Sequence, residues 1–254
     1  MMNPFGNYIM QKLLDVCDEE QRMQILFMVM EEPGKLVRIS LNTHGMRVVQ
    51  KLIETLKTRQ QILLFISALE PGFLDLIKDQ NGTHVVQRCL QCLSNEDNKF
   101  TFDTAAKFCV DIATHKHGCC VLQQCIAHST GEHQELMVAE ISDNGLLLTL
   151  DACGNYVVQY IIELKIPSAT ANLISQFEGN YVHLSMQKFS SNVVEKCIKV
   201  FSEESWSLII HELLSTSRFE LQDPYANYVI QSALGVTKVP RVSNLSLSLS
   251  LSMF

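Results

Sequence analysis

The sequence predicts an all-α fold, a solenoid of stacked helical repeats, and three observations support this fold class. A six-residue motif recurs along the 254 residues: a small residue, two variable residues, two apolar residues and then Gln or Glu. Its copies are almost equally spaced. The apolar residues of each copy recur with the period of a helix and not with that of a strand. Repeats of about 20–50 residues stack because each one needs its neighbours to bury its apolar face.

The repeat boundaries follow from the positions of the motif. Its seven copies are spaced by 39 and 37 residues and then four times by 36, and they begin at Gly6, Gly45, Gly82, Gly118, Gly154, Ser190 and Ala226. We divide residues 1–237 into the repeats 1–30, 31–68, 69–104, 105–140, 141–176, 177–212 and 213–237. Residues 238–254, which alternate Leu and Ser over much of their length, are expected to form a low-complexity tail.

Each copy of the motif is expected to lie on a helix. In the fifth copy, a turn of about 100° per residue places Asn155 and Gln159 on one polar face. The opposite, apolar face contains Val157, Val158 and Ile161. Amphipathic stretches between the copies predict outer helices at 19–30, 59–69 and 206–214. We therefore expect about three helices in each repeat and no strands.

Composition and charge narrow the function classes. The sequence shows neither a signal peptide nor an apolar run long enough to cross a membrane, so we expect the nine cysteines to be reduced thiols in the cytosol or nucleus. Of these two compartments we expect a cytoplasmic protein. A net charge of −7 argues mildly against nucleic acid as a partner. However, Arg47 lies within the motif, and Lys12, Lys51, Arg88 and Lys196 directly follow it. These residues predict local positive charge on the motif face.

The polar face of the motif has a regular chemistry. The second and sixth residues are neighbours on one helix face, and the pairs are Asn7/Gln11, Met46/Gln50, Thr83/Gln87, Cys119/Gln123, Asn155/Gln159, Ser191/Glu195 and Asn227/Gln231. The third residue points toward the adjacent repeat, and this series is Tyr8, Arg47, His84, Cys120, Tyr156, Asn192 and Tyr228. Five of these seven are flat, and a row of flat groups suits stacked bases, each contributing about 1–3 kcal/mol. An amide pair matches the mixed edge of uracil, whereas Glu195 only accepts and suits the donors of guanine.

These motifs resemble the repeats of the Pumilio (PUF) family, and the linkers are most similar to those of plant members. The resemblance covers residues 1–237 and is most specific for Ser-Asn-x-x-Glu at 191–195 and Asn-Tyr-x-x-Gln at 227–231. It implies a right-handed, crescent-shaped α-solenoid that reads single-stranded RNA one base per repeat. It further implies binding to mRNA 3′ untranslated regions, control of translation and mRNA stability, a monomer, and protein co-regulators on the convex face.

The resemblance also implies a target sequence. Family members bind RNA antiparallel, so the last repeat meets the 5′ end. The pairs from the seventh copy back to the first would then read U, G, U, A, then either U or any of several bases, and finally A and U, which gives 5′-UGUA-N-AU-3′. Two residues depart from the family pattern. Cys120 stands where a flat side chain is usual, and Met46 stands where a small one is usual.

Other functions are weighed against this one. A protein-binding solenoid of the armadillo or HEAT kind is the alternative, but it predicts no systematic pairing of Asn with Gln or of Ser with Glu. Cys89-x-x-Cys92 lacks the second pair of a zinc site, and the repeat already accounts for Cys119 beside His115-x-His117. We therefore expect no metal and no cofactor. No nucleophile elbow, P-loop or paired-carboxylate motif occurs, so we expect no enzyme activity.

The ends of the sequence carry a last expectation. The family has eight repeats, so the resemblance implies that one repeat and the first helix of the next are missing before the first copy of the motif. The Leu-Ser tail stands where family members have capping helices. Because solenoids need polar terminal caps, we expect marginal stability at both ends.

Overall fold

The computed structural model describes residues 1–215 and 223–237 of the chain. Every regular element in these residues is a helix, and no strand occurs among them, which confirms the all-α prediction. The chain divides into two compact units, residues 1–137 and 138–254, and each is described by itself. The predicted tail at 238–254 lies outside the described residues.

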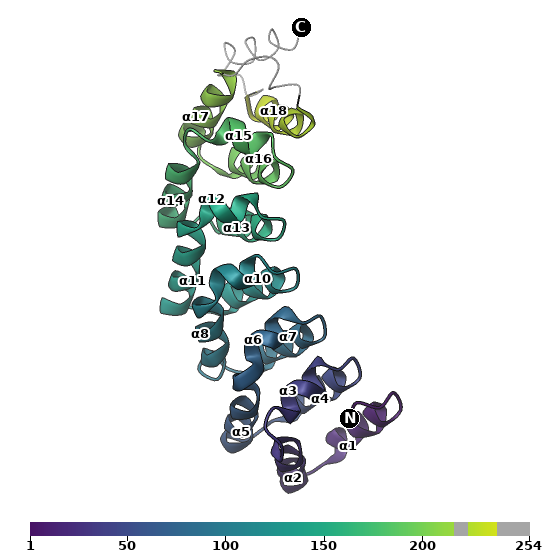
Figure 1. Ribbon diagram of the computed structural model, residues 1–254. Coiled ribbons are helices and arrows are strands. Elements are labelled where there is room, and N and C mark those ends of the chain that lie inside the picture. Colours follow the sequence, from purple (N-terminus) through teal and green to yellow (C-terminus); the bar gives the residue numbers. More distant parts are fainter. Residues whose placement is uncertain (216–222, 238–254) are drawn as a thin grey trace. The chain divides into compact units, whose positions relative to one another are not determined.

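Four helices of the first unit carry the motif, and each begins at its first residue. They are α1 (Gly6–Val16), α4 (Gly45–Thr55), α7 (Gly82–Cys92) and α10 (Gly118–His128). Successive motif helices pack against each other, and Figure 1 shows them as a row. The fourth motif residues Val48, Val85 and Val121 are at most 1% exposed. Burial of this apolar stripe between neighbours is what the repeat pattern predicts.

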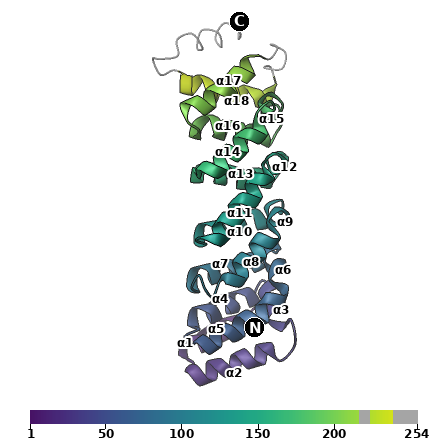
Figure 2. The same ribbon diagram turned by 90° about the vertical axis from the view of Figure 1, so that its left-hand side faces the viewer.

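Two further sets of helices complete the repeats of this unit. Short helices precede the motif helices: α3 (Lys35–Leu41), α6 (Phe73–Lys78) and α9 (Cys109–Ala113). Outer helices follow them: α2 (Glu19–Met30), α5 (Arg59–Leu69) and α8 (Lys99–Lys107). Figure 2 shows the short helices along one edge, apart from α5 and α8. The next outer helix, α11 (Glu132–Asp143), crosses the boundary between the units.

Capping boxes explain where the first two outer helices begin. The Asp18 carboxylate accepts the backbone N–H of Gln21 at 2.9 Å, and the Gln21 side chain accepts the N–H of Asp18 at 3.2 Å. Thr58 and Gln61 form the same reciprocal pair at the start of α5. These contacts satisfy N–H groups that have no partner within the helix.

One stretch differs from the sequence expectation that no membrane span exists. Among the described residues, Arg59–Lys78 is long and apolar enough by length and composition to cross a membrane. In the fold it is not one helix, because the short 3₁₀ turn η1 (Glu70–Gly72) separates α5 from α6. Its aromatic side chains Phe65 and Phe73 are at most 1% exposed. Part of the stretch, including these two side chains, therefore lies in the repeat core.

The small first residue of the motif permits close packing on the preceding short helix. A Cβ atom on Gly82, Gly118 or Gly154 would lie 2.5, 2.6 or 2.7 Å from the carbonyl oxygen of the residue six positions earlier. Ser190 meets the same backbone differently, because its hydroxyl donates to the Leu184 carbonyl at 2.6 Å. The motif helix is thereby held at a fixed distance from the short helix.

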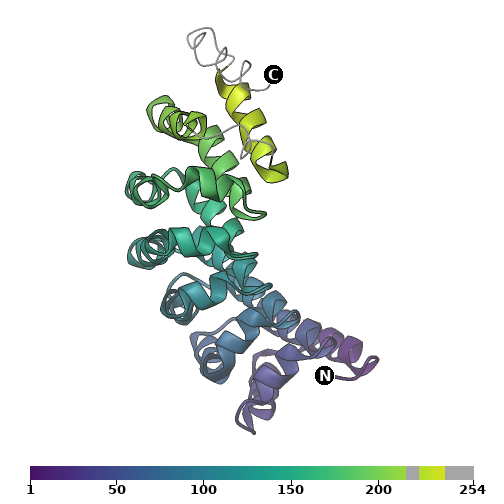
Figure 3. The same ribbon diagram turned by 45° about the horizontal axis from the view of Figure 1, so that its top comes forward.

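The second unit repeats this arrangement. Its motif helices are α13 (Gly154–Leu164), α16 (Ser190–Val200) and α18 (Pro224–Thr237), and α16 packs against both others. The short helices are α12 (Gly145–Leu150) and α15 (Tyr181–Ser185), and the outer ones are α14 (Pro167–Phe177) and α17 (Glu203–Leu214). Figure 3 shows α18, in yellow, beside the green helices of this unit.

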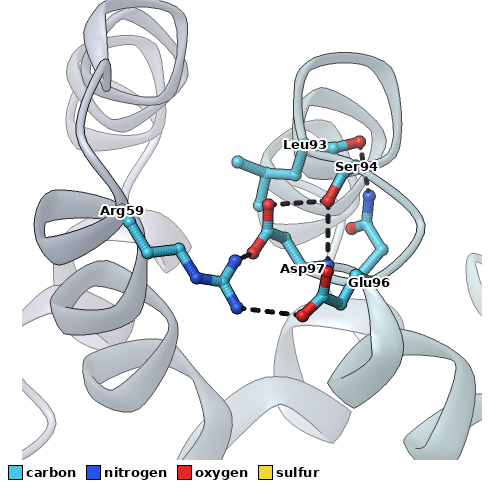
Figure 4. A network of polar contacts seen from close by, with 6 residues as sticks. Arg59, Leu93, Ser94, Glu96 and Asp97 are labelled. Carbon is cyan, nitrogen blue, oxygen red and sulfur yellow. Dashed lines mark hydrogen bonds and ion pairs between the residues drawn. The ribbon is translucent and has the colours of Figure 1, made fainter.

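Polar contacts also join neighbouring repeats. Figure 4 shows Arg59, the first residue of α5, reaching the loop after α7. Its guanidinium pairs with Asp97 and with Glu96, and the Asp97 carboxylate also accepts from the Ser94 hydroxyl at 2.7 Å. Asp97 is buried, with 8% of its side chain exposed, so these donors compensate the loss of its hydration.

Candidate nucleic-acid interface

The second motif residues lie in the first helical turn, and four of them are buried in the described structure: Asn7, Cys119, Asn155 and Ser191. Asn155 shows how such a residue is held. Its side-chain nitrogen donates to the carbonyls of Asp151 at 2.9 Å and Ala152 at 3.0 Å. Its Oδ1 accepts from Nε2 of Gln159 at 3.1 Å. The asparagine therefore fixes the glutamine one turn further on.

The first copy is built in the same way. Asn7 donates to the carbonyls of Asn3 and Pro4 and accepts from Gln11 at 3.1 Å. In both copies the glutamine keeps one N–H and its carbonyl oxygen for a ligand. A donor beside an acceptor is complementary to the edge of uracil.

The second and sixth copies differ from this pattern. Met46 has no oxygen to accept an amide proton, and Gln50 instead donates to the His84 carbonyl of the next motif helix at 2.9 Å. Glu195 forms an ion pair with Lys199 one turn further along α16. Its carboxylate offers acceptors only, while the Ser191 hydroxyl is turned to the Lys188 carbonyl at 3.5 Å.

In the third and seventh copies, the second residue does not form a hydrogen bond with the sixth residue. The Thr83 hydroxyl donates to the Gln80 carbonyl at 2.9 Å, so it is turned away from the half-buried Gln87. The seventh copy has the same two residue types as the fifth, yet Asn227 is only half-buried and Gln231 is exposed. Within the described ranges, no hydrogen bond joins Gln87 to Thr83 or Gln231 to Asn227. In these two copies the second residue therefore does not fix Gln87 or Gln231, and the role expected of both pairs stays a prediction.

The third motif residues are exposed in all seven copies, from Tyr8 to Tyr228. The tyrosines Tyr8, Tyr156 and Tyr228 are 60–63% exposed, which leaves their rings open to solvent. In the first unit, an open groove between α1, α4 and α7 brings three motif copies together, and it is lined by Tyr8, Gln11, Met46, Arg47, Gln50 and His84. Flat and hydrogen-bonding groups thus alternate along one surface of this unit.

Basic residues after the motif lie beside acidic ones. Lys51 pairs with Asp15 of the preceding motif helix at 2.6 Å and with Glu54 at 3.5 Å, and Arg88 pairs with Glu54 at 3.4 Å. The hydrogen bond between Lys51 and Asp15 raises the pKa of the lysine and lowers the pKa of the aspartate. These ion pairs align adjacent motif helices. They also make the groove less positive than the sequence alone predicts.

Cysteines occupy two kinds of position. Burial raises the pKa of the Cys125 thiol to about 12 and also raises the pKa values of Cys89 and Cys197, which share one core position. Cys120 is exposed in the third motif position, and its sulfur lies 4.0 Å from that of Cys119. No group of three or more His, Cys, Asp or Glu side chains placed to hold a metal occurs in the described residues.

One set of functional residues was missed by the sequence reasoning. Asn or Asp stands three residues before five of the seven motif copies, and this recurrence is the sequence signal that could have revealed them. The residues are Asn3, Asn42, Asp79, Asp151 and Asp223. In each, Oδ1 accepts the backbone N–H groups two and three residues further on, at 2.7–3.2 Å. The start of the motif helix is thereby fixed.

Comparison with known proteins adds independent evidence. The family model described as the Pumilio-family RNA binding repeat matches residues 1–30, 35–66, 72–103, 108–142, 144–164, 180–214 and 222–237. The putative pumilio homologues 7 and 8 of Arabidopsis thaliana, both named as chloroplastic, are each 62% identical over 94% of this chain. The chain spans only 37% and 46% of their respective lengths.

Solved structures show the same fold. The Puf4 RNA binding domain bound to the HO endonuclease RNA 3′ UTR recognition sequence has a TM-score of 0.89 and 38% identity, covering 100% of this chain and 79% of that one. The RNA-binding domain of yeast Puf5p bound to SMX2 RNA has a TM-score of 0.78 and 31% identity, covering 99% of this chain and 76% of that one. The predicted solenoid of stacked repeats is thus confirmed.

Proposed function

The chain belongs to the Pumilio family of RNA-binding repeat proteins, of the plant type, and on this basis we propose that it binds single-stranded RNA with sequence specificity. One observation supports this most strongly. Each motif helix combines an exposed third residue with a hydrogen-bonding sixth residue one turn away. Bases stack between the third residues, and the sixth residues contact the base edges.

We propose that the second and sixth residues of the seven pairs contact the base edges and that the RNA runs antiparallel to the chain. The pair Ser191/Glu195 reads G, because a carboxylate accepts both donors of the guanine edge. The Asn/Gln pairs at 7/11, 155/159 and 227/231 read U. With A read by Cys119/Gln123 and by Met46/Gln50, the site is 5′-UGUA-N-AU-3′.

Gln87 and Gln231, which are not fixed by the second residues of their copies, have different consequences in this proposal. Gln87 is not held by Thr83, whose hydroxyl is turned to the backbone, and this supports a poorly specified fifth base. Gln231 is exposed, so its amide is free to turn toward the first base and to be fixed by the base itself. Selection of U at the first base should therefore be weaker than at the third, where Gln159 is already held.

The role proposed for this binding is post-transcriptional. Occupation of a UGUA-containing element in an mRNA 3′ untranslated region would alter translation and mRNA stability through co-regulator proteins on the convex face. The protein acts as a monomer, without metal, cofactor or catalysis, in the cytoplasm and away from membranes. A fluorescent fusion in a leaf cell tests the compartment, since chloroplast import would overturn the cytoplasmic assignment.

A titration with short RNAs tests the specificity. UGUAUAU and a matched RNA with C in place of the G are compared by fluorescence anisotropy at one fixed salt concentration, because phosphate contacts depend on salt. We expect the G-containing RNA to bind more tightly by about 1–3 kcal/mol, the value of one good base-specific contact. Equal affinities would favour the armadillo or HEAT type of protein-binding solenoid instead.

A substitution in one repeat tests the assignment of bases to residues. The double variant Ser191→Asn, Glu195→Gln gives the sixth copy the Asn/Gln pair of the fifth. Preference at the second base should then change from G to U, while preference at the third base stays the same. A variant that still selects G would contradict the assigned pairing.

A further inference from the structure

A turn precedes every motif helix, and its first residue lies three positions before the motif. The backbone carbonyl of this residue accepts the N–H of the second motif residue in all seven copies, at 2.9–3.3 Å. In five copies the residue is Asn or Asp, and its side chain accepts two further N–H groups. N–H groups at a helix start have no partner within the helix, so these bonds stabilise the first turn.

The fourth copy uses an imidazole in place of this carboxylate or amide. His115 Nδ1 accepts the N–H of His117 at 3.3 Å and the N–H of Gly118 at 3.4 Å. The corresponding bonds of Asp79 are shorter, at 2.7 and 2.8 Å. Nδ1 can accept only while it carries no proton, so the ring must be neutral with its proton on Nε2.

Charged groups around His115 come from its own loop and from two packed helices. They are Lys78 of α6, Asp111 of α9, and Lys116 and His117 beside it. Lys78 pairs with Asp111. Burial, followed by the charges of Lys78 and His117, lowers the pKa of His115 below its ordinary value, against a smaller opposite effect of Asp111. The neutral form required by the turn is thus the form that the surroundings favour at neutral pH.

We propose that His115 is a positioning residue for RNA reading by α10, and that its protonation weakens reading of the fourth base. A protonated Nδ1 is itself a donor, so it can no longer accept the N–H groups of His117 and Gly118, and both hydrogen bonds are lost. The first turn of α10 carries Cys119 and Cys120, and one turn later Gln123 faces the base edge. Loss of the turn therefore disturbs all three groups that meet this base. The inference rests on the proposed RNA binding.

The test compares pH profiles of RNA affinity from about pH 5 to pH 8, across the range in which histidine titrates. UGUAUAU is titrated against wild type, His115→Asn and Asp79→His. Asparagine occupies this position in the second copy, so His115→Asn keeps an acceptor that does not titrate. Asp79→His keeps His115 and adds a second titrating acceptor in the turn before α7, which would read the fifth base.

Wild-type affinity should fall by about fivefold toward acid, the value of one lost helix cap, and His115→Asn should remain constant. Asp79→His should show a larger fall than wild type. Equal pH profiles for wild type and His115→Asn would overturn the proposal, whether both fall or neither does. If His115 had only a structural role, its replacement by Asn would weaken RNA binding at every pH and would leave the shape of the pH profile unchanged.

A second readout does not depend on RNA. Amide exchange at Gly118 should be faster in wild type than in His115→Asn at acid pH, and equal in the two proteins at about pH 8. If no RNA binds at any pH, the proposed function fails, and the exchange data still decide the role of His115 in the turn. Equal exchange in both proteins at acid pH would refute that role.

Discussion

Replacement of Asn155 by Ala tests how the base-reading pairs are built. The side chain makes three hydrogen bonds: two to the carbonyls of Asp151 and Ala152, and one from Gln159. A typical intramolecular hydrogen bond contributes about 0.5–1.5 kcal/mol net. The Asp151 carbonyl keeps the backbone N–H of residue 155, and the half-buried Gln159 can bond water. We therefore expect a loss of unfolding free energy of about 2 kcal/mol, the lower part of the summed range.

Two measurements check this expectation. Urea unfolding gives the stability change, and anisotropy with UGUAUAU and its third-base variants gives the specificity change. Gln159, released from Asn155, should distinguish U from C less well at the third base and leave the second base unaffected. The control variant Asn155→Ser supplies the residue found in the sixth copy, whose hydroxyl reaches the backbone, and should lose less stability. A stability loss in Asn155→Ala below about 0.5 kcal/mol would refute the reasoning.

Three further variants probe packing, stacking and the links between repeats. Gly82→Ala places a Cβ against the Leu76 backbone and should destabilise by about 1–3 kcal/mol in a thermal melt, by overpacking. Cys120→Tyr restores a flat group in the fourth copy and should tighten RNA binding by about 1–3 kcal/mol, measured by anisotropy. Arg59→Ala removes the main partner of buried Asp97, and because the arginine is half exposed the stability loss should be about 1 kcal/mol and should shrink at high salt.

Much of the fold could be predicted from the sequence because the repeat is periodic. A near-constant spacing requires equivalent packing in each copy, and the buried Val48, Val85 and Val193 show that packing directly. Six of the seven motif helices begin at the small first residue of the motif, and α18 begins two residues earlier, at Pro224. The outer helix predicted at 59–69 has the same bounds as α5, whereas the turn η1 and the helix α6 that follow it were not located from the sequence.

The turns before the motif helices were not predicted, for a different reason. Asn42 and Asp79 read in the sequence as ordinary loop residues, and only the folded backbone shows that one oxygen reaches two N–H groups. His115 occupies the same position in the fourth copy, and in the sequence it resembled part of a metal-binding motif. Its role becomes visible only when the geometry of the other copies is known.

The charge and hydrogen-bonding state of the motif face depends on contacts between neighbouring side chains, some of which belong to adjacent repeats. Gln50 and Gln159 occupy the same motif position, yet one donates to the next helix and the other to its own Asn. The difference arises from the second residue, since Asn155 offers an acceptor and Met46 offers none. Likewise Lys51 counts as a positive charge in the sequence, but Asp15 of the preceding repeat neutralises it in the fold. Affinity for RNA should therefore depend more on stacking and base edges than on phosphate attraction.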